Sequence, residues 1–422
     1  MYLDDIIRRK KINNQSMKKS TFFDYLNRRT DFGFNSLLSK GEEDQDYINW
    51  NDFLLPSHYG DSEQEYTAIR ECAAMFDVSP IRKIRITGKG AGRILDHTFT
   101  RPVSQSPSMR GIYVAYCNED GSLKDDSILY KFADDDYLLM PSDIDHTPHL
   151  EFLRNHLAMD STEVSFTECT NQWSGLAIQG PSSATVIDAM GFQGVEKINP
   201  FEVVDFALAN KKVKIARMGF TADLGYECWF KTNQASDIMR VINRAKSKLD
   251  FELIGYGLNA LEVCRLEGGF VVAGWDFATQ LDPDPDFERS PYEVGLGWLV
   301  DLQGIDFVGK QALMSEQSAG QKWVHRSVQI DVAEKDPKQP LLGELYIIVD
   351  DKDVSIGSIN CSAWSWGLQM VIGNAAILSE HQNLSEAVLL VDNKKYQVKI
   401  TRGAHINLER RNKVPAILDL CI

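Results

Sequence analysis

A turn signal followed by a carboxylate pair constrains the fold of this chain more than any other stretch. From Cys117 the sequence reads Cys-Asn-Glu-Asp-Gly-Ser-Leu-Lys-Asp-Asp-Ser-Ile-Leu-Tyr. Its Asp-Gly pair is a preferred hairpin turn, and polar and apolar residues alternate after Asp125 and Asp126. Adjacent strand residues point to opposite faces, so only one of the two carboxylates can enter a cavity. We predict a β-hairpin with acid at its mouth, although an isolated Asp-Asp pair is more often a solvated turn.

Length and charge narrow the class of protein. A chain of 422 residues suggests two or three domains with ample core. The net charge of −15 argues against nucleic acid and against an anionic membrane surface as partners. No segment reaches the roughly 18 apolar residues that a membrane span needs, and the N-terminus has no signal-peptide core. We expect a soluble protein, either a monomer or a homodimer.

Cysteine and histidine spacing excludes the common metal and disulfide patterns. The seven cysteines are scattered singly, without a C-x-x-C pair, so neither a disulfide framework nor a zinc site is indicated. The cytoplasm is therefore the expected compartment. His146 and His149 fall in a predicted loop-to-helix stretch, where we expect surface residues rather than metal ligands.

The order of predicted elements favours a mixed α+β fold. Residues 1–48 read as an N-terminal extension, with basic clusters and then an acidic patch. Residues 49–325 mix helices and strands without a regular βαβ rhythm, beginning with a helix predicted over 63–76 from its apolar stripe. Residues 326–422 contain short strand runs, such as 344–349 and 396–400, separated by turns. That composition predicts a separate all-β module.

Familiar catalytic signatures are missing from the sequence. The glycines of 88–92 have the wrong spacing for a dinucleotide loop, and neither a phosphate loop nor a G-x-S-x-G elbow is present. The chemistry must rest on scattered residues that the fold brings together. That arrangement suits a bound organic cofactor better than a nucleophile triad.

Four further segments join the Asp pair and carry a family resemblance. They are Met-Phe-Asp-Val-Ser from 75, Gly-Phe-Thr-Ala-Asp-Leu-Gly-Tyr-Glu from 219, Gly-Leu-Asn-Ala-Leu-Glu-Val-Cys-Arg-Leu-Glu-Gly-Gly from 257, and Pro-Tyr-Glu-Val-Gly-Leu-Gly-Trp from 291 with Asp-Phe-Val-Gly-Lys-Gln-Ala-Leu from 306. In this order the chain resembles, over about 49–422, the glycine-cleavage T-protein family of tetrahydrofolate-dependent one-carbon transferases. The dimethylsulfoniopropionate demethylase branch is the closer resemblance.

The resemblance implies a fold and a folate site. The fold would be a three-subdomain cloverleaf around a central folate hole, with a barrel or jelly-roll-like β-module at the C-terminus. Asp126 matches the acid beside the pterin N5 and the transferred carbon. Glu227 matches the carboxylate that binds the pterin amino-pyrimidine edge. The other implied cofactor-binding residues are Tyr113, Ile128, Tyr130, Phe220 and Arg265. Two of them also have a purely structural interpretation: Tyr113 could be an ordinary strand aromatic, and Arg265 could form an ion pair at a helix end.

Departures from the family pattern fall mainly on the substrate side. Pro80 replaces the histidine that usually follows Asp-Val-Ser, and Ala273 replaces a tyrosine. Phe220 stands where the family usually has tyrosine, and residues 282–288 form an acidic insertion. We therefore expect a retained folate and a changed donor.

The expected reaction moves a methyl group from a small donor to N5 of tetrahydrofolate. The donor would be a sulfonium, a betaine or a methyl ether. A glycine-cleavage aminomethyltransferase, which must also dock a lipoyl carrier protein, is the alternative enzyme. A non-catalytic folate-binding protein of the same fold is the third reading.

Aromatic side chains are the natural holders of a cationic methyl donor, because ring faces attract cations without attacking them. Each such aromatic residue could instead be a structural residue of the core or of an interface. A methyl ether would use the same rings for stacking, so the donor class stays open. The donor-side candidates are Tyr116, Trp275, Trp298, Trp364 and Trp366.

Overall fold

The computed structural model describes residues 18–26, 47–142, 144–159, 162–280, 283–331, 345–391 and 394–415. Most of the predicted N-terminal extension, residues 1–48, lies outside the described residues. Its part at 18–26 contains the short helix α2 (Phe23–Leu26) and packs on the body, where Phe22 and Leu26 are buried. The two-stranded sheet β1 (Tyr47–Trp50) and β2 (Phe53–Pro56) adjoins it through a bridge between Lys18 and Phe53.

The predicted hairpin is present and forms one edge of a five-stranded sheet. Strands β5 (Arg110–Cys117) and β6 (Leu123–Ala133) pair antiparallel, with Tyr116 opposite Asp125 and Ala115 opposite Asp126. Gly121 takes a φ of 85°, which a residue without a Cβ adopts at little cost. The sheet order is β5-β6-β7-β4-β8. Its other strands are β7 (Asp136–Pro141), β4 (Ile84–Thr87) and β8 (Ser165–Glu168), and its helices are α5 (Ala91–Thr98) and α6 (Thr147–His156).

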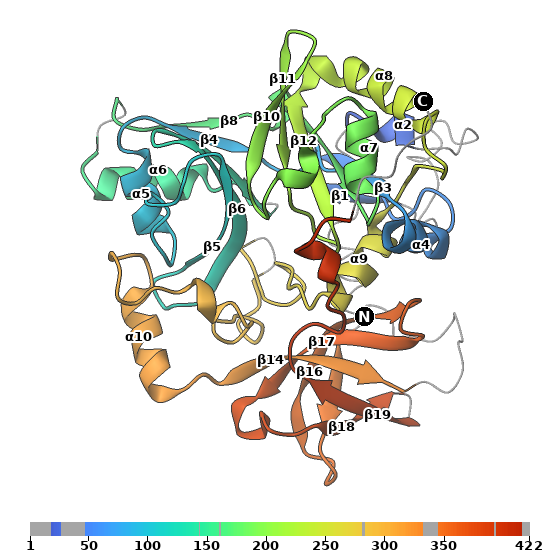
Figure 1. Ribbon diagram of the computed structural model, residues 1–422. Helices are drawn as coiled ribbons and strands as arrows, with labels where there is room; N and C mark the ends of the chain where they lie inside the picture. Colours follow the sequence, from blue (N-terminus) through green and yellow to red (C-terminus); the bar gives the residue numbers. More distant parts are fainter. Residues whose placement is uncertain are drawn as a thin grey trace.

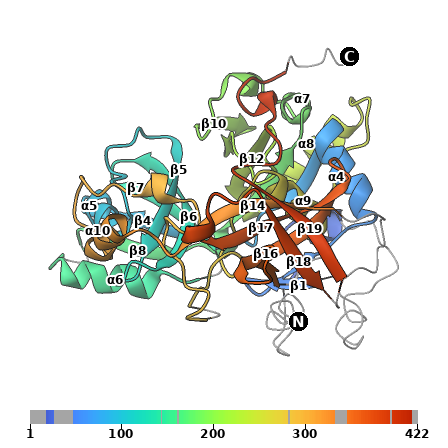
Figure 2. The same cartoon turned by 90° about the horizontal axis from the view of Figure 1, so that it is seen from below.

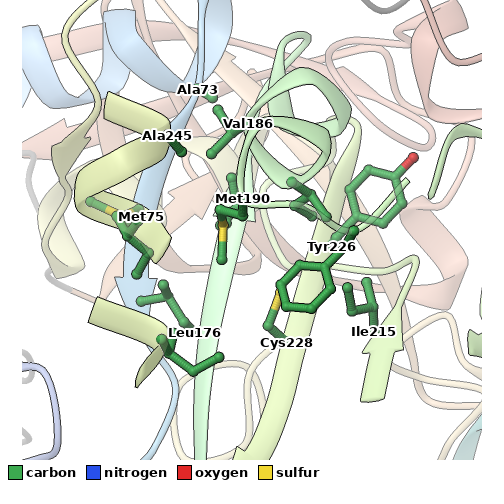
Figure 3. Close-up of a cluster of buried hydrophobic side chains, with 14 of the residues drawn as sticks. Ala73, Met75, Leu176, Val186, Met190, Ile215, Tyr226, Cys228 and Ala245 are labelled. Carbon is green, nitrogen blue, oxygen red and sulfur yellow. The ribbon is translucent and has the colours of Figure 1, made fainter. Parts of the chain in front are cut away.

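A second sheet has six strands in the order β10-β11-β12-β9-β3-β13. Along β12, Tyr226, Cys228 and Phe230 point to one face, where they pack with α7 and α8 in a large apolar core (Figure 3). Trp229 points to the other face and shares a core with Tyr130 of the first sheet. The elements are β10 (Val203–Leu208), β11 (Lys211–Ala216), β12 (Gly225–Lys231), β9 (Trp173–Gln179), β3 (Ala74–Asp77), β13 (Ile254–Gly255), α7 (Ser183–Ala189) and α8 (Ala235–Lys246).

The helix predicted over 63–76 is too long. Helix α4 spans Ser62–Glu71, with the Asp61 side chain accepting from the Gln64 N–H as an N-cap. Ala73 is not helical and Phe76 lies in strand β3, between β9 and β13. Both residues fit a helical stripe. The sheet overrides that local pattern because β3 is buried on both sides and pairs along both edges.

The C-terminal part is a closed six-stranded barrel, as the run of short strands predicted. Its order is β14-β17-β16-β15-β18-β19, and α10 (Lys310–Ala319) precedes it. The first sheet, the second sheet and the barrel surround the middle of the molecule in Figure 1, and Figure 2 shows the first sheet and the barrel on different sides. The strands are β14 (Trp323–Ile330), β15 (Tyr346–Val349), β16 (Ser355–Ser365), β17 (Met370–Leu378), β18 (Glu386–Val391) and β19 (Lys394–Thr401).

The buried carboxylate of Glu267 forms hydrogen bonds that connect helices to the barrel. Glu267 ends helix α9 (Leu258–Glu267), is fully buried and accepts from the Tyr66 hydroxyl at 2.7 Å. Ser365 of β16 donates to the same oxygen, Oε1, at 2.6 Å, and the other oxygen, Oε2, accepts from Arg70 at 2.6 Å. Arg70 also binds Asp223, at 3.1 Å. One carboxylate thus joins α4, α9 and the barrel.

The structure confirms the predicted class of mixed helices and strands with a C-terminal β-barrel. The boundaries at 48/49 and 325/326 stay a prediction. Within the described residues, no helix combines the length and the apolar character that a bilayer crossing requires.

Candidate active site

Two carboxylates from different sheets lie on strand faces that contribute to one shared core. On β6, Asp126, Ile128 and Tyr130 share the face that looks away from α5 and α6, because strand residues alternate. On β12, Glu227 lies on the same face as Trp229. Tyr130 connects the two strands, since its hydroxyl donates to Glu227 Oε2 at 3.0 Å. Tyr130 and Glu227 are therefore in contact, and Asp126 lies on the same strand face as Tyr130; that the three residues share one ligand site stays a prediction.

Tyr113 orients the carboxylate of Asp126. The Tyr113 hydroxyl donates to its Oδ2 at 2.6 Å, across the β5–β6 pair. Burial, and then the neighbouring Asp125 carboxylate, raises the pKa of Asp126 to about 7, while the Tyr113 bond acts in the opposite direction. A carboxyl group with this pKa changes its charge near neutral pH, which suits a group that must balance charge during a reaction.

Asp125 occupies the opposite face and is fully buried. His146 Nε2 lies 2.9 Å from its Oδ2, and the backbone N–H groups of Ser142 and Asp126 donate to the carboxylate at 3.2 and 2.9 Å. The prediction that His146 is a surface residue is wrong, because its side chain is 1% exposed. Burial lowers the pKa of His146 to about 3, so the ring is neutral and donates its N–H. The pair fixes the strand on which Asp126 sits.

Glu227 is also held through a single oxygen. Its Oε2 accepts from Tyr130 and from Trp229 Nε1, at 3.0 and 3.1 Å. Burial raises its pKa, and the hydrogen bonds of Tyr130 and Trp229 and the charge of Lys83 oppose that shift. Within the described chain, no bond to Oε1 of Glu227 is formed. That oxygen remains for a ligand N–H.

Lys83 is a functional-site neighbour that sequence reasoning missed. Its side chain is fully buried, its Nζ lies 5.1 Å from the centre of the Trp229 ring, and the Ser79 and Ile81 carbonyls accept from it at 2.9 and 2.6 Å. Burial lowers its pKa to about 7. Lys83 precedes a strand with alternating polar residues, where a lysine is normally solvated. Its sequence context therefore carries no signal of burial.

Arg265 is fully buried and bound within the protein. Its guanidinium donates to Glu262 at 2.8 Å, to the Phe270 carbonyl at 2.9 Å and to Asp276 at 3.1 Å, and it contacts the Cys361 sulfur at 3.3 Å. These bonds favour the helix-end ion pair over a contact with a folate tail. Its predicted cofactor role stays a prediction, which these internal partners do not favour.

The predicted aromatic residues separate into different surroundings. Tyr116 is buried on the Asp125 side of the sheet, in edge contact with His146, and is not brought to Asp126. Trp298 is 63% exposed, and its ring centre lies 6.0 Å from that of Tyr113. Trp298 thus contacts Tyr113, whose hydroxyl binds Asp126.

The remaining predicted aromatics lie elsewhere. Trp275 packs beneath the Arg265 guanidinium, at 5.4 Å. Trp364 packs against the barrel core, whereas Trp366 contacts Tyr66 of α4 at 5.4 Å. The two tryptophans therefore do not act as one cage. Phe220 is 40% exposed and packs against Phe270 at 5.3 Å.

Comparisons with known proteins agree with this architecture. A sequence profile of the family described as the GCVT N-terminal domain matches residues 42–304. The aminomethyltransferase of Thermotoga maritima is 28% identical over 281 residues, which cover 67% of this chain and 73% of that protein. The aminomethyltransferase of Halalkalibacterium halodurans is 27% identical over 345 residues, 81% of this chain and 89% of that protein.

A solved structure has the same fold. The glycine cleavage system aminomethyltransferase T from Bartonella henselae superposes with a TM-score of 0.74, over 93% of this chain and 99% of that chain, at 17% identity. The likeness therefore extends beyond the profile match and through the C-terminal barrel.

Proposed function

The chain belongs to the GCVT N-terminal domain family, whose proteins use tetrahydrofolate, and we propose that it transfers an aminomethyl-derived carbon to tetrahydrofolate. The relatives named above are aminomethyltransferases, and this favours that reaction over the methyl transfer expected from the sequence. The observation that carries the proposal is the pair Asp126 and Glu227. These carboxylates project from different sheets, and Tyr130 connects their strands.

The residues present fit a reduced folate. A pterin edge offers several N–H donors, and a carboxylate with one oxygen held and the other unbonded is the matching acceptor. Glu227 has this arrangement, with Tyr130 and Trp229 on Oε2. Along β6, Asp126 stands four residues from Tyr130, about 13 Å for an extended strand, so the two carboxylates can serve separate parts of one flat ligand.

The roles of the protein groups follow from their surroundings. Bound tetrahydrofolate supplies N5 as the acceptor of the carbon. Asp126 would stabilise the positive charge that grows beside it, and Tyr113 fixes the orientation of its carboxylate. Glu227 would orient the ligand, and the hydrogen bonds of Tyr130 and Trp229, with the charge of Lys83, oppose the rise that burial causes in its pKa. The Asp125–His146 pair holds the strand so that the Asp126 carboxylate faces the inner region.

A product assay tests the reaction. Purified protein, tetrahydrofolate and an aminomethyl-loaded lipoyl carrier protein should release ammonia and form 5,10-methylenetetrahydrofolate. The carrier without its aminomethyl group is the control. Formation of 5-methyltetrahydrofolate from a betaine, a sulfonium acid or a methoxybenzoate, with no ammonia release from the carrier, would instead establish demethylation.

Demethylation remains the second candidate because of one local feature. Pro80 stands where the family usually has histidine, and this segment is built around its own contacts. Asn51 donates to the Pro80 carbonyl at 2.9 Å, and Lys83 caps the carbonyls of Ser79 and Ile81. Because Pro80 offers neither an imidazole nor a backbone N–H to a donor, this segment favours a donor different from the family's usual one.

Replacing Glu227 by glutamine should weaken tetrahydrofolate binding about 30- to 100-fold. An amide presents one oxygen instead of two, and it loses the charge that strengthens hydrogen bonds by about 2–3 kcal/mol. Calorimetric titration measures the dissociation constant. Glu386→Gln, on an exposed barrel strand, is the matched control. Equal affinity in both variants would remove Glu227 from the folate site.

The reaction rate should rise with pH through an apparent pKa near 7. The raised pKa of Asp126 means that the active carboxylate is lost below this value, so kcat/KM falls as the pH falls. The apparent value belongs to the Asp125–Asp126 pair rather than to one residue. Tyr113→Phe removes a hydrogen bond that lowers the pKa of Asp126, and should move the midpoint upward by about 0.7 units. A flat profile between pH 6 and 8 would contradict the assignment.

A further inference from the structure

Arg101 is a partly buried cation beside the site that has no carboxylate partner among the described residues. Its Nη2 donates to the backbone carbonyl of Tyr113, and its guanidinium lies 5.6 Å from the centre of the Trp298 ring. Its Nε is buried and makes no hydrogen bond to the described chain. Burial lowers the pKa of Arg101, and no neighbouring carboxylate opposes that shift. Buried charges in proteins are normally paired.

Two other arginines of the described chain, both largely buried, are paired with carboxylates. Arg70 binds Glu267 and Asp223, and Arg265 binds Glu262 and Asp276, with nitrogen–oxygen distances of 2.6–3.1 Å. Arg101 differs from these two because its contacts within the described chain are a carbonyl and a ring face. A guanidinium arranged in this way still has N–H groups for a bidentate acceptor. Its counter-charge is therefore expected from outside the chain.

The backbone at Arg101 is fixed from two directions. The N–H of Thr100 donates to the Ala115 carbonyl at 2.9 Å, and its hydroxyl donates to the Leu299 carbonyl at 2.8 Å. The Asp301 N–H donates back to the Thr100 carbonyl at 2.8 Å. The loop that carries Arg101 is thus tied both to β5 and to the turn that carries Trp298. A tethered arginine loses little entropy when it binds a ligand.

A row of contacts leads from Arg101 to the acid of the site. Arg101 packs on Trp298, Trp298 lies beside Tyr113, and the Tyr113 hydroxyl bonds Asp126. Trp298 is 63% exposed, although it packs against both neighbours. An exposed indole beside an unpaired guanidinium offers a stacking face and a cation together. This combination suits a flat or extended organic anion.

We propose that Arg101 and Trp298 form a subsite for the carboxylate of a ligand whose reacting end lies beside Asp126. The inference rests on the proposed function, because it places that reacting end in the one-carbon transfer site. The carboxylate has two sources of the same chemistry, the glutamate tail of tetrahydrofolate or a free carboxylate-bearing donor. Beside the Asp126 carboxylate, Arg101 would supply a positive charge that attracts an anion.

Calorimetric titration of Arg101→Gln separates these sources. The probes are tetrahydrofolate, tetrahydropteroate (which lacks the glutamate), and glycine betaine and 4-methoxybenzoate with their methyl esters. Arg93→Gln, an exposed change of the same charge on α5, is the control, and thermal melting checks the fold. Arg101→Gln should raise the dissociation constant of the carboxylate-bearing ligand about 10- to 100-fold. The dissociation constant of the matching probe without the carboxylate should stay unchanged. Arg101→Lys, which keeps the charge but loses the fork, should recover part of the loss.

Each outcome has a defined meaning. A loss confined to tetrahydrofolate, with tetrahydropteroate unaffected, supports the subsite and assigns it to the folate tail. A loss confined to the small carboxylates supports it and assigns it to the donor. Equal affinities of wild type and Arg101→Gln for every carboxylate-bearing probe that binds would overturn the subsite. Failure of wild type to bind either folate would overturn the proposed function instead, and the small-carboxylate titrations would still decide the role of Arg101.

Discussion

Asp126→Asn should lower kcat about 100- to 1,000-fold without unfolding the protein. The amide keeps the shape of the side chain and can still accept from Tyr113, but it cannot balance a positive charge that develops beside it. Stability should hold or rise, because a carboxyl group whose pKa is raised by burial is unfavourable to ionise at neutral pH. The assay of one-carbon transfer and a thermal melt measure the two effects.

The matched control for Asp126→Asn is Asp135→Asn. Asp135 is exposed and lies in the turn between β6, the strand that carries Asp126, and β7. It removes the same charge and should change neither kcat nor the melting temperature. Turnover of Asp126→Asn within about threefold of the control would assign the chemistry to another group. A joint loss of activity and folding would show that Asp126 is structural.

Glu267→Ala is expected to have the largest effect on stability, a loss of about 3–5 kcal/mol in the free energy of unfolding. The substitution leaves Arg70 without its shortest ion pair, and it deprives Tyr66 and Ser365 of their acceptor. Because these groups belong to α4 and the barrel, both attachments of α9 weaken together. Urea unfolding, followed by circular dichroism, gives the change.

A second substitution separates the buried charge from the packing. Arg70→Met in the Glu267→Ala background removes the unpaired cation and should restore part of the loss, so the two changes should not be additive. Glu71→Ala, an exposed change at the end of α4, should alter stability by less than about 0.5 kcal/mol. Additive losses in the double variant would mean that the ion pair contributes little.

Local patterns predicted those parts of the site that depend on strand geometry. The Asp-Gly turn predicted the hairpin. The alternation of side chains along a strand predicted that Asp126, Ile128 and Tyr130 lie on one face. It also separated Asp125 from Asp126. The barrel followed from short strand runs. In each instance the determining interactions lie within a few residues along the chain or repeat regularly in the sequence.

Contacts between distant segments were beyond local prediction. His146 meets Asp125 because α6 returns over the first sheet, and Lys83 meets Trp229 because two sheets pack face to face. Phe76 fits a helical stripe but lies in a central strand. Arg265 has partners on both sides of α9, and no spacing rule indicates them. These features depend on tertiary packing, which periodicity does not encode.

The strand order of the second sheet also governs how the chain folds during synthesis. Strand β3 pairs with β9, where Ala74 meets Gln179, and with β13, where Ala74 meets Ile254. At about 5–20 residues per second, the ribosome needs roughly 10–40 s between making β3 and making β13. During that time the edge of β3 that later pairs with β13 has no partner strand. An unpaired edge at Met75 and Phe76 is prone to pair with other chains. Refolding from denaturant should therefore be slow, and the newly made chain should depend on chaperones until residue 255 has emerged.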